Sequence, residues 1–280
     1  MKKLNFPNLY KYILSQLENH LIDDHHIEAS ILLKYFIKEK KITEDTNLSP
    51  SNQSFLLKII QKRSLGFPLQ YITQEVNFYK SKFYVNSSVL IPRPETEILI
   101  EQCIEFIKIN KIKNPNIIDI GTGSGAIAIS IAKEISGSII YAVDISKQAL
   151  DVAKINAKKN DVIIQFIEGD LFGDIDCNFD IIISNPPYIM TDKIKNLQRE
   201  VLYEPVLALD GGLNGMDIIS KIINIGINKI NKKTTSGIFI EIDPQVLPSL
   251  RKILSELPDN FKYNIKNDYS DYPRILSITT

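Results

Sequence analysis

The sequence of 280 residues contains no tryptophan, two cysteines and three histidines. Cys103 and Cys177 lie far apart and neither belongs to a Cys-x-x-Cys pair, which argues against a disulfide framework or a zinc knuckle. All three histidines fall between His20 and His26, and His25 and His26 end the polar stretch Asp23-Asp24-His25-His26, which is typical of the start of a helix. We interpret this cluster as a solvated helix cap and predict no metal site; a metal site there is the alternative.

An excess of charge of one sign and long apolar runs are also missing. The 33 basic and 33 acidic side chains give a formal net charge of zero, which argues against wholesale binding to nucleic acid, since such proteins usually have a basic domain. The longest uncharged run, residues 120–132, has 13 residues and three glycines. A membrane-spanning helix needs roughly 20 apolar residues. We therefore expect a cytoplasmic protein with no membrane partner.

Apolar residues at helical spacing predict that the first part of the chain is helical. They recur in three segments, at residues 9–17, 29–36 and 55–60. A β-hairpin pattern follows around Lys80, and the prolines and acids of residues 92–97 open a further helix. We predict a helical domain over residues 1–70, a β-hairpin linker over 71–93 and a larger domain over 94–280.

From residue 116 onward, apolar strand patterns alternate with helical ones. The predicted strands cover residues 117–120, 139–143, 162–167, 179–184, 237–242, 261–266 and 274–279. The predicted helices cover residues 125–135, 146–158, 216–230 and 245–256. This alternation predicts an α/β fold, with a mostly parallel sheet of seven strands covered on both faces by helices.

A glycine-rich turn follows the first strand of the predicted sheet, in the sequence Asp-Ile-Gly-Thr-Gly-Ser-Gly of residues 119–125. Glycines let a ligand approach the main chain closely, and the following helix presents unpaired N–H groups. Asp144 ends the next strand, where a carboxylate can accept hydrogen bonds from ribose hydroxyls. This pattern fits NAD, S-adenosylmethionine (AdoMet) or a turn without a ligand. Asp119 favours AdoMet, because a carboxylate suits its cationic methionine end and repels a pyrophosphate.

The segment Asn185-Pro186-Pro187-Tyr188 follows the fourth predicted strand, at the sheet edge where ligands bind in such folds. The prolines leave carbonyl oxygens as acceptors, Asn185 adds a side-chain acceptor, and Tyr188 offers a flat face for stacking. A planar NH2 group is a poor nucleophile because its lone pair is delocalised. Acceptors that bind both of its hydrogens can direct that lone pair toward an electrophilic methyl group. We favour an N-methyltransferase over a rigid turn without function.

With these motifs the sequence resembles the HemK-type protein-(glutamine-N5) methyltransferases, which modify peptide chain release factors and support translation termination. Three further segments carry the resemblance: residues 66–72, Gly-Phe-Pro-Leu-Gln-Tyr-Ile; residues 90–97, Leu-Ile-Pro-Arg-Pro-Glu-Thr-Glu; and residues 203–212, Tyr-Glu-Pro-Val-Leu-Ala-Leu-Asp-Gly-Gly. The resemblance implies a Rossmann-like AdoMet-dependent methyltransferase sheet and an N-terminal helical domain that recognises the substrate. One departure is visible after Glu241, where the family continues with glycine and glutamine and this chain has Ile242-Asp243-Pro244.

The resemblance also implies a role for each motif residue. The expected AdoMet-binding residues are Gly121, Thr122, Gly123, Ser124, Gly125, Asp144, Asp170, Leu171 and Asn185. The substrate glutamine, which belongs to a Gly-Gly-Gln loop, is expected to lie against Asn185, Pro186, Pro187 and Tyr188. Asn185 and the carbonyl of Pro186 are the expected catalytic groups. The products would be N5-methylglutamine and S-adenosylhomocysteine.

Two other functions fit part of the pattern. A methyltransferase for the exocyclic amine of DNA adenine or RNA guanine needs the same acceptors, together with a basic groove and a flipped base. The zero net charge counts against it. A non-catalytic module that binds AdoMet or NAD would leave the Asn-Pro-Pro-Tyr segment without a purpose. We therefore expect a release factor as the protein partner and no direct contact with nucleic acid.

Overall fold

The computed structural model describes residues 6–20, 22, 24–43 and 48–280, and the chain divides into two compact units. The first unit comprises residues 1–74 and 198–203, and the second comprises residues 75–197 and 204–280. A short piece from the second half of the chain thus belongs to the N-terminal unit. That this unit recognises the substrate stays a prediction.

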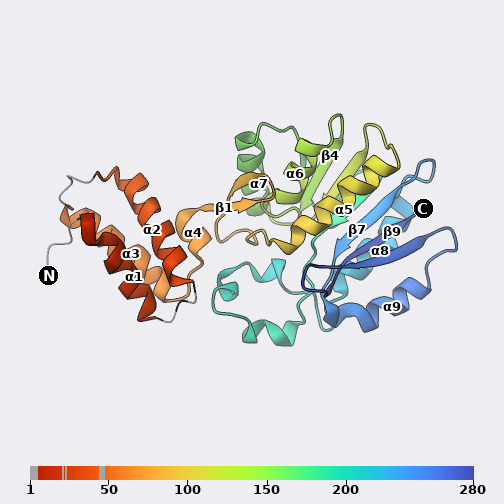
Figure 1. The fold of residues 1–280 in the computed structure, drawn as a ribbon. Helices are drawn as coiled ribbons and strands as arrows, with labels where there is room; N and C mark the ends of the chain where they lie inside the picture. Colours follow the sequence, from red (N-terminus) through yellow and green to blue (C-terminus); the bar gives the residue numbers. More distant parts are fainter. Residues whose placement is uncertain (1–5, 21, 23, 44–47) are drawn as a thin grey trace. The chain divides into compact units, whose positions relative to one another are not determined.

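Helices form the described part of the first unit (Figure 1). They are η1 (Phe6–Asn8), α1 (Leu9–Glu18), α2 (His25–Lys40), α3 (Pro50–Ser64) and α4 (Leu69–Thr73), and η3 (Val201–Tyr203) joins them from the later segment. The side chains at the predicted helical spacing are buried between them, among them Ile13, Leu32, Phe36 and Leu56. The predicted N-terminal helices are therefore confirmed. No helix within the described ranges is both long and apolar enough to cross a membrane.

Two long-range contacts hold residues 198–203 in the first unit. The buried Arg63 donates to both carboxylate oxygens of Glu28, at 2.5 and 2.9 Å, and to Glu200 Oε1 at 2.9 Å. The ring of Tyr203 meets that of Phe67 edge to face at 5.2 Å. A guanidinium fork that binds a carboxylate through two parallel bonds fixes geometry as well as charge. Arg63 therefore ties α3 both to α2 and to this later segment.

The second unit opens with a hairpin and is built on a sheet of seven strands. The hairpin strands are β1 (Glu75–Phe78) and β2 (Ser81–Tyr84), and the sheet strands are β3 (Asn116–Ile120), β4 (Ile139–Asp144), β5 (Gln165–Glu168), β6 (Ile181–Ser184), β7 (Gly237–Glu241), β8 (Lys262–Asn267) and β9 (Pro273–Thr279). The order is β5-β4-β3-β6-β7-β9-β8. Strands β3 to β7 run parallel, and β9 pairs antiparallel with both β7 and β8. The mostly parallel sheet of seven strands is confirmed.

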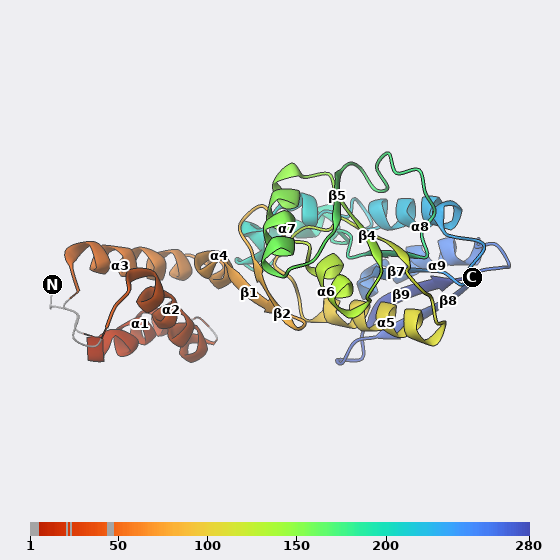
Figure 2. The ribbon, with the colours of Figure 1, turned by 90° about the horizontal axis from the view of Figure 1, so that it is seen from above.

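Helices cover both faces of this sheet (Figure 2). The helices are α5 (Glu95–Ile109), α6 (Ala126–Glu134), α7 (Lys147–Lys159), α8 (Asp217–Lys229) and α9 (Leu247–Ser255). Neighbouring strand residues point to opposite faces, so Ile181 and Ile183 pack with α5 and α6, whereas Ile182 packs with α8 and α9. A strand buried on both faces reads as an unbroken apolar run, which explains the sequence Ile-Ile-Ile of β6.

The strand order reverses between β3 and β6, which are neighbours in the sheet. From β3 the chain moves outward through β4 and β5, and it then returns to place β6 on the other side of β3. In open α/β sheets, ligands bind outside the carboxyl ends of the strands at such a switch point. The glycine-rich turn follows β3 and the Asn-Pro-Pro-Tyr segment follows β6, so the fold brings both motifs to this point.

Candidate active site

A cavity of about 210 Å³ opens in the second unit at the carboxyl ends of β3, β4 and β6. A single water needs roughly 10–15 Å³, so the cavity has room for a small molecule. Its lining residues come from the hairpin, the residues before α5, the glycine-rich turn, the ends of β4, β5 and β6, and residues 205–208. Two charged side chains are among them, Asp144 and Asp170, and both are acidic.

The glycine-rich turn forms one wall of the cavity through residues 121–124. Gly121 and Gly123 have φ angles of 69° and 55°, in the left-handed region that favours glycine. A Cβ atom added at Gly121 would meet no other atom within 4 Å, so its main chain faces open space. Gly125 is the N-cap of α6 and does not line the cavity, and its expected role in cofactor binding stays a prediction.

Asp119 does not line the cavity, which differs from the expectation that its carboxylate faces a cationic ligand. The side chain is fully buried beneath the turn, where Oδ2 accepts hydrogen bonds from the Thr122 hydroxyl at 2.6 Å and from the Ala128 N–H at 3.3 Å. Burial raises the pKa of Asp119 to about 7. Asp119 thus connects the turn to α6 from below.

Asp144 ends β4 and lines the cavity, as the ribose-binding prediction requires. Its Oδ2 accepts a hydrogen bond from the Gly123 N–H at 2.8 Å, and its Oδ1 accepts one from the Ser146 N–H at 2.9 Å. Burial raises the pKa of this carboxyl, and these main-chain donors oppose the rise. A carboxylate has about four lone-pair positions, so two remain for a ligand. Ribose binding stays a prediction.

Asp170 and Leu171, which follow β5, also line the cavity. Leu171 has a φ angle of 50°, an uncommon conformation for a side chain of this kind and one that costs free energy. Ile145 and Leu207 add apolar surface to the same lining. Apolar side chains beside an acidic one suit a flat, partly polar ring, which is consistent with the expected adenine position.

Only part of the Asn-Pro-Pro-Tyr segment faces the cavity. Asn185 and Pro187 line it, whereas Pro186 and Tyr188 do not. The Nδ2 group of Asn185 donates a hydrogen bond to the hydroxyl of Thr96, at 3.0 Å. Among the described residues no donor to Asn185 Oδ1 is found, which leaves this oxygen for a substrate. The predicted roles of all four residues stay predictions.

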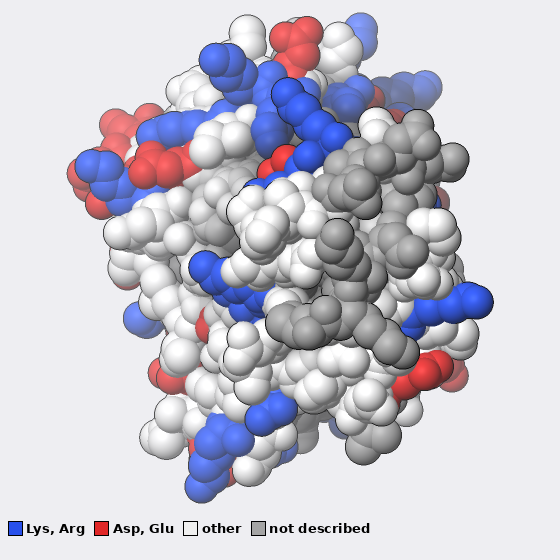
Figure 3. Space-filling view, turned by 90° about the vertical axis from the view of Figure 1, so that its left-hand side faces the viewer, with Lys and Arg blue, Asp and Glu red and all other residues white. Residues whose placement is uncertain are grey.

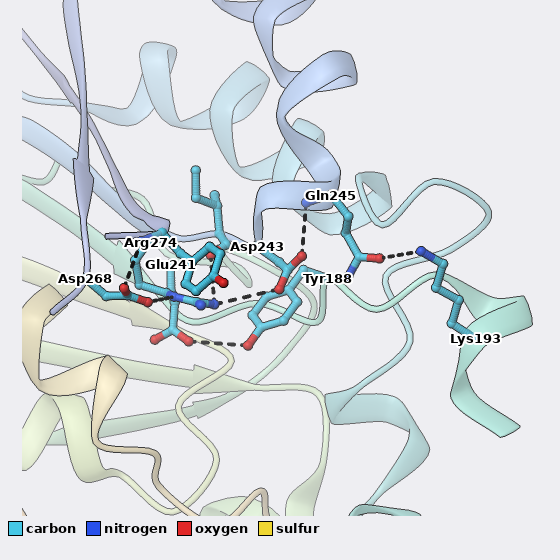
Figure 4. Close-up of polar contacts among 9 residues, drawn as sticks. Tyr188, Lys193, Glu241, Asp243, Gln245, Asp268 and Arg274 are labelled. Atoms are coloured by element: carbon cyan, nitrogen blue, oxygen red, sulfur yellow. Dashed lines mark hydrogen bonds and ion pairs between the residues drawn. The ribbon is translucent and has the colours of Figure 1, made fainter. Parts of the chain in front are cut away.

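Tyr188 points toward the end of β7 rather than into the cavity (Figure 4). Its hydroxyl donates to Oε1 of Glu241 at 3.4 Å, and burial together with this carboxylate raises the pKa of Tyr188. Arg274 of β9 lies beside the pair and binds Asp268 at 3.1 Å. Tyr188 therefore contacts a buried carboxylate that sequence reasoning did not place in the site.

Two of the segments that carry the resemblance, residues 90–97 and 203–212, meet at Glu204. This buried carboxylate accepts a hydrogen bond from the Ile91 N–H at 3.0 Å and forms an ion pair with Arg93. Pro92 lines the cavity and Pro94 is the N-cap of α5, so this segment has one residue at the cavity and one at the start of a helix. Sequence reasoning missed the roles of Thr96, Glu204 and Glu241. Thr96 and Glu204 belong to the motifs at residues 90–97 and 203–212, and this membership could have indicated that they have a role.

One group in the first unit has the spacing of a metal site among the residues that the structure describes: Glu18, His25 and His26. His25 Nε2 lies 3.6 Å from Glu18 Oε1, and its Nδ1 lies 3.0 Å from the carbonyl oxygen of Ile22. Glu18 is the last residue of α1, and His25 and His26 begin α2, where the sequence predicts a helix cap. They lie outside the cavity.

Comparison with known proteins gives two kinds of similarity. The profile of a family described as "Methyltransferase small domain" matches residues 96–212. A protein of Flavobacterium psychrophilum named "Release factor glutamine methyltransferase" is 43% identical over 201 residues, which cover 68% of this chain and 70% of the relative. A protein of Dictyoglomus turgidum with the same name is 36% identical over 259 residues, which cover 90% of each.

Solved structures show the same fold at low identity. The hMettl16 catalytic domain in complex with MAT2A 3'UTR hairpin 6 superimposes with a TM-score of 0.54 at 15% identity, over 83% of each chain. The 16S rRNA N2 G1207 methyltransferase of T. thermophilus, in complex with AdoMet and guanosine, gives a TM-score of 0.53 at 16% identity, over 72% of this chain and 48% of that one. These likenesses concern the fold of the sheet and its helices.

Proposed function

The chain belongs to the family of release factor glutamine methyltransferases, and on this premise we propose that it methylates the side-chain amide nitrogen of a release factor glutamine with AdoMet. The observation that carries the proposal is the position of Asn185. Its acceptor oxygen has no donor within the described part of the chain, and it shares one cavity with the glycine-rich turn and Asp144.

The residues of the cavity fit AdoMet better than a dinucleotide. Both charged side chains of the lining are acidic, and AdoMet carries a cationic sulfonium and ammonium group, whereas NAD carries an anionic pyrophosphate. The open main chain at Gly121 and Gly123 would border the methionine part, and Asp144 would accept hydrogen bonds from the ribose hydroxyls. When bound, AdoMet supplies an electrophilic methyl group.

The chain's own contribution is to bind and orient the glutamine amide. Asn185 Oδ1 and the main-chain carbonyl of Pro186, a residue that does not itself line the cavity, would accept the two amide hydrogens, so the nitrogen lone pair points away from both acceptors. Acceptors already fixed in place stabilise the positive charge that develops on nitrogen without having to reorganise. Pro187 restricts the ψ angle of Pro186, which sets the direction of this carbonyl. The cavity lining contains no histidine, and the proton would leave to solvent after transfer.

A nucleobase amine is the alternative substrate, because the same acceptors suit adenine or guanine. The cavity lining contains no Lys or Arg that would bind a phosphate backbone. On the face shown in Figure 3, Lys and Arg side chains lie among Asp and Glu side chains. Proteins that bind nucleic acid usually concentrate basic residues on one face. Charge therefore favours the protein substrate.

Incubation with radiolabelled AdoMet tests the proposal, with a release factor, duplex DNA and ribosomal RNA offered in parallel. We expect label on the release factor, and none on a release factor in which the Gly-Gly-Gln glutamine is replaced by alanine. Label on nucleic acid alone would contradict the proposal. No transfer to any acceptor, with AdoMet bound, would support a non-catalytic module instead.

A further inference from the structure

The carboxylate of Glu241 is buried behind the candidate site and has no role in the chemistry described so far. It is 1% exposed and ends β7. Its Oε1 accepts the hydroxyl hydrogen of Tyr188 at 3.4 Å, and its Oε2 forms no hydrogen bond of good geometry with a described residue. A buried carboxylate without full partners is costly to the fold, which suggests that it serves a function.

Thr96 connects this carboxylate to Asn185. The Thr96 side chain lines the cavity, accepts the Nδ2 hydrogen bond of Asn185 at 3.0 Å and is itself 4% exposed. A hydrogen-bonding interaction with Thr96 also lowers the pKa of Glu241, against the larger rise that burial causes. The three side chains come from β7, the first turn of α5 and the residue after β6.

The number of hydrogens available in the hydrogen-bonded series Glu241, Thr96 and Asn185 decides which way the Asn185 amide points. The Thr96 hydroxyl has one hydrogen, and an ionised carboxylate can only accept. Thr96 therefore donates toward Glu241 and is left with lone pairs for its other neighbour. Asn185 must then present Nδ2 to Thr96, which turns Oδ1 toward the cavity. The flipped amide would offer N–H groups to a substrate amide whose own hydrogens need acceptors.

We propose that Thr96 and Glu241 are positioning residues that hold the amide of Asn185 with its oxygen toward the substrate. This inference rests on the proposed function, because it concerns the acceptor that binds the glutamine amide. Neither residue needs to touch the reacting atoms. They fix which group donates and which accepts in the hydrogen-bonded series, because ionised Glu241 can only accept.

Protonation of Glu241 would reverse the donor and acceptor roles in this series. A neutral carboxyl can donate to Thr96, whose hydrogen is then free to meet Asn185 Oδ1. Burial raises the pKa of Glu241 to about 7, and nearby Glu95 raises it further, whereas Arg274, Thr96 and Tyr188 lower it. Arg274 is in turn bound by Asp268 and lies 3.8 Å from Asp243. Turnover should therefore fall on acidification through about pH 7.

Three variants test the proposal in methyl transfer to a release factor. Thr96→Val keeps the shape and removes the hydroxyl, and we expect kcat to fall about tenfold while the KM for AdoMet stays within about twofold. Thr96→Ser keeps the hydroxyl and should retain kcat within about twofold of the wild type. Glu241→Gln cannot ionise, so the rise in kcat of about tenfold between pH 6 and pH 8 in the wild type should be lost.

The outcomes distinguish a failure of the positioning role from a failure of the proposed methyltransferase function. Thr96→Val with wild-type kcat, or an equal loss in Thr96→Val and Thr96→Ser, would overturn the positioning role while the function stands. A wild-type protein that binds AdoMet and leaves the release factor unmodified would overturn both. If Thr96→Val does not fold, as judged by thermal unfolding, the pH profile of Glu241→Gln decides: an acid limb that persists unchanged overturns the inference.

Discussion

Replacing Asp144 with alanine tests whether the end of β4 holds the ribose of AdoMet. In the structure this carboxylate accepts the Gly123 N–H at 2.8 Å and the Ser146 N–H at 2.9 Å, which leaves about two lone-pair positions toward the cavity. Hydrogen bonds to a charged group contribute roughly 1.5–3 kcal/mol each. Two lost ribose contacts at the lower value give about 3 kcal/mol, or a roughly 150-fold weaker Kd.

Isothermal titration calorimetry at pH 8 measures this Kd. The variant also loses the acceptor for two main-chain donors, Gly123 in the turn and Ser146 before α7, so we expect its free energy of unfolding to fall by about 2 kcal/mol. Thermal unfolding shows whether the variant is folded during the titration. Asp151→Asn, at an exposed position on α7, is the matched control and should bind like the wild type. A folded Asp144→Ala that binds AdoMet within about threefold of the wild type would refute the reasoning.

Further predictions concern the turn, the residue beneath it and the helical unit. Gly123→Ala should lower Tm and weaken AdoMet binding in calorimetry, because φ is 55° and a left-handed conformation costs an L-residue about 1–2 kcal/mol; wild-type affinity would contradict this. The pKa of Asp119 is raised to about 7, so between about pH 4 and 7 the folded state holds a proton that the unfolded chain releases, and this contribution to stability falls as pH rises. In urea unfolding, the free energy of unfolding of Asp119→Asn should therefore rise by about 2 kcal/mol relative to that of the wild type between pH 5 and pH 7. An unchanged difference between the two proteins would contradict the account. Arg63→Ala should reduce the free energy of urea unfolding by about 3 kcal/mol by leaving the partly buried Glu28 unpaired, whereas Lys34→Ala at an exposed position should not.

The regular elements of the second unit were predictable because burial on a sheet leaves a periodic trace. Ile181–Ser184 is an unbroken buried run, and the glycine turn and Asn185 stand where strands end, so the switch point could be placed from the sequence. The pairing of Arg63 with Glu200 could not, because 137 residues separate them and periodicity says only that a side chain is buried. For the same reason sequence reasoning directed Asp119 toward the ligand and Tyr188 toward the substrate, whereas neither side chain lines the cavity. Asp119 contacts the glycine-rich turn and Tyr188 packs against a core cluster, and these contacts depend on how the elements pack in the fold.

Glu241 illustrates a second limit. Its strand was predicted, but a carboxylate at a strand end reads equally as solvent-exposed or as part of a site. Only the structure shows that it is buried and that Thr96 and Tyr188, from separate elements, converge on it. The departure from the family pattern at residues 242–244 begins directly after it.

Mass spectrometry of the Gly-Gly-Gln peptide, after reaction of the release factor with AdoMet and either the wild type or Asn185→Ala, tests the central claim most directly. The account predicts one added methyl group on the glutamine side chain with the wild type. It predicts turnover lower by about 100-fold with Asn185→Ala, and an AdoMet Kd within about threefold of the wild type. An unmodified glutamine with the AdoMet-bound wild type, or equal losses of turnover and affinity in the variant, would contradict it.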